Sequence, residues 1–129
     1  MGPVATIRAY IGRINAGDPE GLAKLATERT RFVDATGGRH VLSREAWAAY
    51  FADFPDYHIR VERIFSHGTS VAVFGVASGS YRGRGAASPG PAWRFPAAWS
   101  ARVRAGKVTE WRVYGDIEPM LRSAGVGRS

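Results

Sequence analysis

The sequence predicts an α+β domain in which helices come first and most strands follow. Up to residue 55, apolar residues recur every three or four positions in three segments, which is the spacing of one helix face. Beyond it, apolar and polar residues alternate over long runs separated by short glycine-containing turns, as in antiparallel strands. A length of 129 residues suits a single hydrophobic core, so we expect residues 1–129 to form one domain.

Three helices are expected in the N-terminal half, over residues 3–15, 19–26 and 44–54. The first tolerates a proline near its start because the first helical turn has no amide hydrogen bond to lose. The second and third each follow a residue that commonly caps a helix N-terminus, Asp18 and Ser43. Pro55 ends the third helix because a proline disfavours helical geometry in the residue before it.

Five strands are expected, over residues 29–35, 57–66, 70–81, 93–104 and 107–114. Residues 70–81 are apolar on both faces, which predicts burial on both. The Gly-, Arg-, Ser- and Pro-containing segment 82–91 is predicted to be a flexible loop. Residues 117–124 are interpreted as a short helix or a tail, and residues 122–129 as a tail.

Composition and charge exclude several classes of site. There is no cysteine, and the three histidines lack a metal-ligand spacing, so we expect neither a metal nor a cofactor. The net charge of +7 is spread along the chain without a run of five or more basic residues, so we expect no nucleic-acid partner. No apolar run approaches the about 18 residues of a membrane span, so we expect no membrane contact and a cytoplasmic protein.

Two polar residues, Tyr10 and Asp34, are candidates for chemistry. Tyr10 lies among the apolar residues of the first helix, and Asp34 follows an apolar pair near the end of the first strand. A phenol donor and a carboxylate base are the groups that shift a proton beside a carbonyl. Each also has a structural interpretation, because Tyr10 can be a core tyrosine with a backbone partner and Asp34 can organise a turn over residues 35–38.

Three segments together resemble the ketosteroid isomerase and SnoaL-like branch of the nuclear transport factor 2-like superfamily. They are YIGRINAGD at residues 10–18, the segment ending at Asp34, and AGKVTEWRVYGD at residues 105–116. The resemblance extends over roughly residues 7–121. It implies that the antiparallel sheet curves around the helices as a cone-shaped barrel with an internal cavity.

The resemblance also implies roles for the two candidate residues. In such isomerases a carboxylate matching Asp34 removes a proton alpha to a ketone, and a tyrosine matching Tyr10 donates a hydrogen bond to the enolate oxygen. We therefore predict that both side chains project into one apolar pocket. Burial among aromatic side chains would raise the pKa of Asp34 toward that of a general base.

Two departures from the family pattern disfavour two known activities of the family. The second, protonated acid of the steroid isomerases corresponds to Ala98, and losing one such donor typically costs about 10²- to 10³-fold in rate. The Arg-x-Asp pattern of the limonene epoxide hydrolases corresponds to Pro96, Ala97 and Ala98. Both activities are therefore disfavoured. A register slip of one residue would instead aim the Trp99 indole, a hydrogen-bond donor, into the cavity.

Further residues are predicted to contact a ligand. These candidate substrate-binding residues are Phe32, Trp47, Phe51, Trp99, Tyr114 and Asp116. Asp116 also has a structural interpretation, either as a cap of the segment that follows it or as the partner of an arginine. His58 is interpreted as a surface residue of its strand.

The sequence therefore predicts a small-molecule enzyme that transfers a proton during isomerisation or cyclisation of an apolar carbonyl or polyketide-like compound. The alternative is a domain that binds a small ligand in the same cavity without turnover, because one fold can support both. A homodimer is expected, with residues 71–81 and 93–103 near the contact, because a sheet apolar on both faces leaves one face to be covered.

Overall fold

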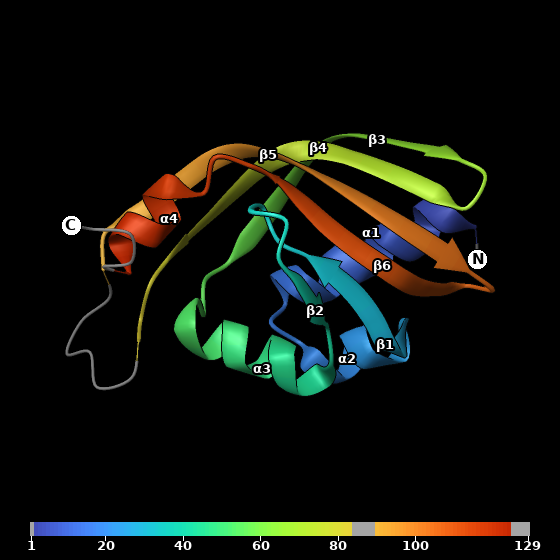
Figure 1. Cartoon of the computed structure of the whole chain (residues 1–129), viewed down its shortest axis with the longest axis horizontal. Coiled ribbons are helices and arrows are strands. Elements are labelled where there is room, and N and C mark those ends of the chain that lie inside the picture. The colour runs from blue at the N-terminus through green and yellow to red at the C-terminus, as the bar shows by residue number, and fades with distance from the viewer. Residues whose placement is uncertain (1, 84–89, 125–129) are drawn as a thin grey trace.

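The computed structural model describes residues 2–83 and 90–124, which form helices packed on one curved six-stranded sheet (Figure 1). The elements are α1 (Pro3–Asn15), α2 (Pro19–Lys24), β1 (Ala26–Val33), β2 (Arg39–Val41), α3 (Arg44–Asp53), β3 (His58–His67), β4 (Ser70–Ser80), β5 (Ala92–Arg104), β6 (Lys107–Gly115) and α4 (Glu118–Ser123). The predicted α+β class is confirmed. Within the described residues, no helix is both long and apolar enough to cross a membrane.

The sheet has the strand order β2-β1-β6-β5-β4-β3. All neighbouring strands are antiparallel except β1 and β6, which run parallel. The sequence predicted an antiparallel sheet because short turns join successive strands, but no turn joins β1 to β6 and fixes their relative direction. The strands β2 and β3 form the two edges of the described sheet, so it is curved and open, not a closed barrel.

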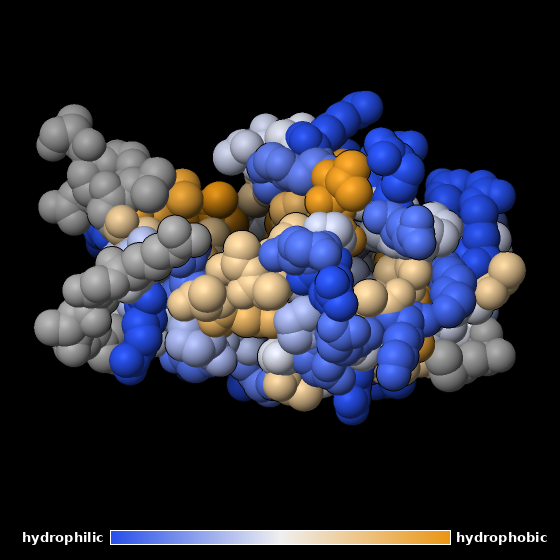
Figure 2. Space-filling model, turned by 90° about the horizontal axis from the view of Figure 1, so that it is seen from below, coloured by the Kyte–Doolittle hydropathy of each residue, from blue (hydrophilic) through white to orange (hydrophobic). Residues whose placement is uncertain are grey.

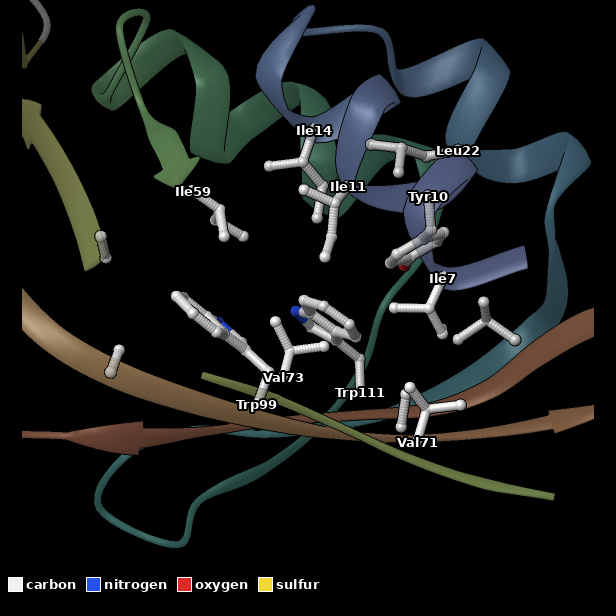
Figure 3. Packing of buried hydrophobic residues seen from close by; sticks show 14 of the residues in the cluster. Ile7, Tyr10, Ile11, Ile14, Leu22, Ile59, Val71, Val73, Trp99 and Trp111 are labelled. Atoms are coloured by element: carbon white, nitrogen blue, oxygen red, sulfur yellow. The ribbon is translucent and has the colours of Figure 1, made fainter. Parts of the chain in front are cut away.

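The concave face of the sheet packs against α1, and this contact forms the core (Figure 3). Trp99 and Trp111 point from the sheet toward the helix, where Ile7 and Tyr10 point back toward them. The rings of Tyr10 and Trp111 meet edge to face with centroids 5.3 Å apart. The indoles of Trp99 and Trp111 are stacked at 6.4 Å. Aromatic contacts therefore fill the centre of the layer between helix and sheet.

The burial pattern of β5 shows which of its residues face the helices. Its alternating burial places Trp99 inside, with 1% of its surface exposed. Ala98 points to the outer face, in register with Phe74 of β4 and Tyr114 of β6. The inward register of Trp99, which the sequence left open, is therefore the one adopted.

Strand β4 differs from the expectation that both of its faces are buried. Val71, Val73 and Ala77 face the core, but Phe74 on the outer face is 37% exposed. No helix of the described chain covers that face (Figure 1), because α1, α2 and α3 pack on the concave side and α4 lines the pocket on the same side. The expectation was wrong for the single chain because one layer of helices covers only one side of the sheet.

The element boundaries differ most from the predicted ones around β1 and β2. Strand β1 spans Ala26–Val33 instead of residues 29–35, and α2 ends at Lys24 instead of residue 26. Thr27, Glu28 and Arg29 are polar and exposed, so the start of the strand shows no alternation. Strand β2 was not predicted, since its three residues are all exposed. The predicted loop 82–91 and tail 122–129 fall in part on residues 84–89 and 125–129, which lie outside the described residues.

Asn15 at the end of α1 joins the helix to β3. Its side-chain amide donates to the carbonyl oxygen of Ile59 at 2.9 Å and accepts from the amide of the same residue at 2.8 Å. Both backbone groups of Ile59, which is 1% exposed, therefore depend on one side chain for these hydrogen bonds.

Replacing Asn15 by alanine should lower the free energy of unfolding by about 1–3 kcal/mol, because the Ile59 backbone groups lose their partners inside the protein. Urea unfolding followed by tryptophan fluorescence measures the change. Arg8→Ala, at an exposed position of the same helix, is the matched control and should change stability little. Equal stability of the two variants would contradict the role of Asn15.

Candidate functional site

A pocket of about 610 Å³ lies between the concave face of the sheet, α3, α4 and the β1–β2 hairpin. Figure 2 views the molecule from the side of the helices and shows apolar residues around a hollow in that surface. The lining residues are Phe32, Asp34, Ala35, Thr36, His40, Val41, Leu42, Ala46, Trp47, Tyr50, Tyr57, Phe95, Trp99, Trp111, Val113, Ile117, Met120 and Leu121.

The pocket is largely apolar and aromatic, with few groups that exchange protons. Its titratable side chains are Asp34, His40, Tyr50 and Tyr57, and none of its lining residues is a lysine or arginine. An apolar wall with a few placed polar groups is the usual composition of a small-molecule site, and the volume falls in the usual range. The pocket is therefore suited to a mostly apolar ligand that carries one or two polar atoms.

Asp34 organises the turn that links β1 to β2. Its Oδ1 accepts hydrogen bonds from the amides of Thr36 and Gly38 at 2.9 and 2.8 Å and from the Thr36 hydroxyl at 2.7 Å. Its Oδ2 lies 2.8 Å from Nε2 of His40. The carboxylate therefore organises the turn, as considered from the sequence, and it also lies at the edge of the pocket.

The predicted rise in the pKa of Asp34 is wrong. The hydrogen bond with His40, followed by those from Thr36 and Gly38, lowers the pKa of this carboxyl far below its usual range, against a smaller opposing effect of burial. The sequence suggested burial among aromatic residues, but the side chain is about one-third exposed and has several donors. Asp34 is therefore ionised at neutral pH, and its affinity for a proton is weak.

Tyr10 does not share the pocket with Asp34, contrary to the prediction. Its side chain is fully buried in the core, and its hydroxyl accepts a hydrogen bond from Nε1 of Trp47 at 3.2 Å. It is absent from the pocket lining, whereas Trp47 and Trp111, which contact it, both belong to that lining. The apolar face of α1 packs so closely on the sheet that Tyr10 supports the pocket wall from behind.

Tyr50 and Tyr57 bring two phenols into the pocket that the sequence did not single out. Their rings meet edge to face at 5.0 Å, and the Tyr50 hydroxyl lies 3.8 Å from Sδ of Met120 in α4. Burial raises the pKa of both hydroxyls, and for Tyr57 the side chains of Trp99 and Tyr50 offset part of this rise. Both phenols therefore stay protonated at neutral pH and can donate hydrogen bonds.

The other predicted ligand contacts divide into two groups. Phe32, Trp47 and Trp99 line the pocket. Phe51 stacks on the Trp47 indole at 5.4 Å but is not part of the lining. Its place on the apolar face of α3 suggested a contact, but Trp47 occupies the inward position.

Tyr114 and Asp116 lie away from the pocket, contrary to the prediction. Tyr114 is 45% exposed on the outer face of the sheet, with the Arg112 guanidinium 4.8 Å from its ring centroid. The preceding residue, Val113, lines the pocket instead, because successive strand residues face opposite sides. Asp116 accepts a hydrogen bond from the amide of Glu118 at the start of α4, which is the capping role considered from the sequence.

His40 is the pocket residue that sequence reasoning missed most clearly. It follows Asp34 by six residues and pairs with Phe32 across the β1–β2 hairpin. The glycine pair after Asp34 indicated a turn, and a hairpin built on that turn would have placed His40 opposite Phe32. Across residues 2–83 and 90–124, no three His, Asp or Glu side chains converge in an arrangement that could bind a metal ion.

The chain matches the family model described as the SnoaL-like domain over residues 7–111. No curated protein matches the sequence. The match covers the β1–β2 hairpin, α3 and the strands that line the pocket as far as Trp111 in β6.

Solved structures with the same fold cover nearly the whole chain. IdmH of Streptomyces antibioticus, a proposed polyketide cyclase, is 27% identical, with 98% of this chain and 100% of that chain covered and a TM-score of 0.75. A proposed polyketide cyclase of Xanthomonas campestris pv. campestris is 19% identical, with coverages of 94% and 95% and a TM-score of 0.77. A protein of ketosteroid isomerase-like fold from Catenulispora acidiphila, in complex with trimethylamine, is 21% identical, with coverages of 94% and 92% and a TM-score of 0.72.

Replacing Asp34 by asparagine should make the protein less stable at neutral pH and less sensitive to acid. Since the folded state lowers the pKa of Asp34, its ionised form stabilises the fold above its ordinary pKa, and that stability is lost as the pH falls. Thermal unfolding between pH about 7 and 2.5 should show the melting temperatures of wild type and variant converging below pH about 4.

The control for this experiment is Glu28→Gln, an exposed acid that makes no side-chain hydrogen bond among the described residues. Its melting curve should follow that of the wild type at every pH. A constant difference between wild type and Asp34→Asn across the whole range would contradict the stabilising role of the ionised carboxylate.

Proposed function

Because the chain belongs to the SnoaL-like domain family, we propose that it is a small-molecule enzyme that transfers a proton beside a carbonyl group. The substrate class is an apolar carbonyl or polyketide-like compound, and the outcome is isomerisation or cyclisation. The relatives described as proposed polyketide cyclases support this class of substrate. The bound trimethylamine in another relative supports small-ligand binding within this fold.

The observation that carries the proposal is the composition of the pocket. Aromatic and aliphatic side chains make up most of its wall, and the titratable groups among them differ in electrostatic character. Asp34 is an anion, whereas Tyr50 and Tyr57 are neutral phenols, whose pKa burial raises further above neutral pH. Titratable groups whose environments push their pKa values apart are typical of acid–base sites.

The proton transfer requires a base and a hydrogen-bond donor to the enolate oxygen, and the pocket contains groups of both kinds. A base at the Asp34 edge of the pocket takes the proton from the carbon next to the carbonyl, and the electron pair of that C–H bond moves onto the carbonyl oxygen. Phenolic O–H groups of Tyr50 and Tyr57 then donate to the enolate oxygen, in the role that the sequence had assigned to Tyr10. Return of the proton to another carbon, or attack of the enolate carbon on a second carbonyl, completes isomerisation or cyclisation.

The same geometry argues against the two better-known reactions of similar proteins. Ala98 carries no acid, and its position faces the outer side of the sheet. Pro96, two residues earlier, shares that outward face. We therefore expect neither steroid isomerisation at the usual efficiency nor epoxide hydrolysis.

Tyr57→Phe should lower the rate of alpha-proton exchange by about 10-fold if Tyr50 shares the oxyanion, and by about 10²-fold or more if Tyr57 acts alone. The measurement is deuterium incorporation from D₂O into 2-tetralone and anthrone, followed by NMR. Tyr81→Phe is the matched control, because Tyr81 lies outside the pocket lining, and it should exchange like the wild type.

Binding of these ketones without exchange above the buffer rate would contradict the enzymatic proposal. It would favour the alternative of a ligand-binding domain in the same pocket. Quenching of tryptophan fluorescence reports binding separately from exchange, because three indoles line the pocket.

We also propose that the protein forms a homodimer through the outer face of the sheet. Phe65 and Phe74 form an exposed aromatic pair on β3 and β4, with ring centroids 6.2 Å apart, and Arg63 lies 5.1 Å from the Phe74 ring. Tyr114 continues this patch across β5, since Phe74 and Tyr114 both pair with Ala98. Such an apolar patch is of the kind that symmetric dimers bury.

Light scattering at tens of micromolar should give the mass of a dimer, and Phe74→Glu should give a monomer because it places a charge at the centre of the patch. The control is Ser70→Glu, an exposed position at the start of the same strand, which should leave the dimer intact. A monomer mass for the wild type would overturn this proposal.

A further inference from the structure

His40 and Asp34 form a pair at the edge of the pocket that resembles a base with its orienting carboxylate. His40 belongs to β2 and lines the pocket, and its Nε2 lies 2.8 Å from Oδ2 of Asp34. Its ring lies against the Phe32 ring, with centroids 5.7 Å apart and planes inclined at 35°. The imidazole is therefore positioned on one side by a carboxylate and on one face by an aromatic ring.

The carboxylate determines which nitrogen of the neutral imidazole carries the proton. An ionised carboxylate can only accept hydrogen bonds, so Nε2 of His40 must be the N–H donor. The lone pair of a neutral ring then lies on Nδ1, which makes no hydrogen bond to any described residue. One ring nitrogen is thus held by Asp34, and the other remains available as a base.

Asp34 itself has little capacity left to act as the base. Its Oδ1 already accepts from the Thr36 amide, the Thr36 hydroxyl and the Gly38 amide, and its Oδ2 faces His40. Taking up a proton would weaken this set of hydrogen bonds, which agrees with its lowered pKa. The same hydrogen bonds fix the direction in which the carboxylate presents Oδ2 to the histidine.

We propose that His40 is the catalytic base of the reaction and that Asp34 is its positioning residue. Nδ1 of His40 takes the proton alpha to the carbonyl, the C–H electron pair moves into the enolate, and the imidazolium formed is stabilised by the adjacent carboxylate. The imidazolium then returns the proton to the product carbon, so that no oxidant or co-reactant is needed. This inference rests on the proposed function and assigns its base.

The test compares alpha-proton exchange of 2-tetralone and anthrone in D₂O for the wild type, His40→Ala and Asp34→Asn. His40→Ala should lower kcat by about 10²- to 10⁴-fold with KM nearly unchanged, because a general base contributes that much to the rate. Added imidazole should restore part of the exchange to His40→Ala, by occupying the space of the missing ring. A merely structural histidine would not produce this rescue.

Asp34→Asn should lower kcat less than His40→Ala, and imidazole should not rescue it, because the ring is present but loses the charged carboxylate beside Nε2. Nitrogen NMR of the His40 ring should show the Nε2–H form in the wild type and a mixture of forms in Asp34→Asn. His58→Ala is the matched control, since His58 is exposed on β3 and outside the pocket lining, and it should behave like the wild type.

Two outcomes separate the failure of this inference from the failure of the proposed function. Wild-type exchange that survives in His40→Ala but is abolished in Asp34→Asn would make Asp34 the base and overturn the inference alone. Absence of exchange in the wild type would overturn the proposed function and the inference with it. Circular dichroism of each variant distinguishes loss of the fold from loss of the base.

Discussion

The pocket depends on the hydrogen bond between the Trp47 indole and the Tyr10 hydroxyl, 3.2 Å long, because it joins α3 to α1 inside the core. Trp47 is the one buried residue of α3, and a helix of ten residues is marginal unless it packs on its neighbours. Both polar atoms are tolerated in the core since the indole N–H donates to the phenol oxygen. Trp47 also lines the pocket, so the contact that secures the helix also fixes a wall of the ligand site.

The pKa values of titratable groups in the pocket shift in opposite directions because their local surroundings differ. The Tyr57 phenol is enclosed by aromatic side chains, so desolvation dominates and its pKa rises. Asp34 lies in a tight turn whose amides and hydroxyl converge on it, so hydrogen bonds dominate and its pKa falls. The fold thereby keeps neutral donors and a fixed anion in one largely apolar site, and the anion orients the one histidine in that site.

Sequence periodicity was sufficient to predict the helices, the long strands and the alternation of β5, since each reflects burial on one face. It could not predict β2, whose three residues are all exposed, or the parallel pairing of β1 with β6, which no local turn dictates.

The site was predicted less well than the fold, because its geometry depends on contacts between elements that are distant in the sequence. Whether Tyr10 lines a pocket or supports its wall depends on how closely α1 packs on Trp111, and no local pattern contains that distance. Likewise, the donors that lower the pKa of Asp34 converge only when the turn has formed.

The register of β5 shows why a shared fold does not imply a shared reaction. Position 98 faces outward, so an acid there would not reach the pocket, and the inward position beside it is filled by Trp99. The indole occupies space in the core that a carboxylic acid would leave open, and it stacks on Trp111 to close that side of the pocket. In the proposed reaction the oxyanion donors therefore come from other elements, and Tyr50 of α3 and Tyr57, which precedes β3, are the phenols that line the pocket. The scaffold is thus common to the family, while the identity of the reaction depends on which side chains its concave face happens to present.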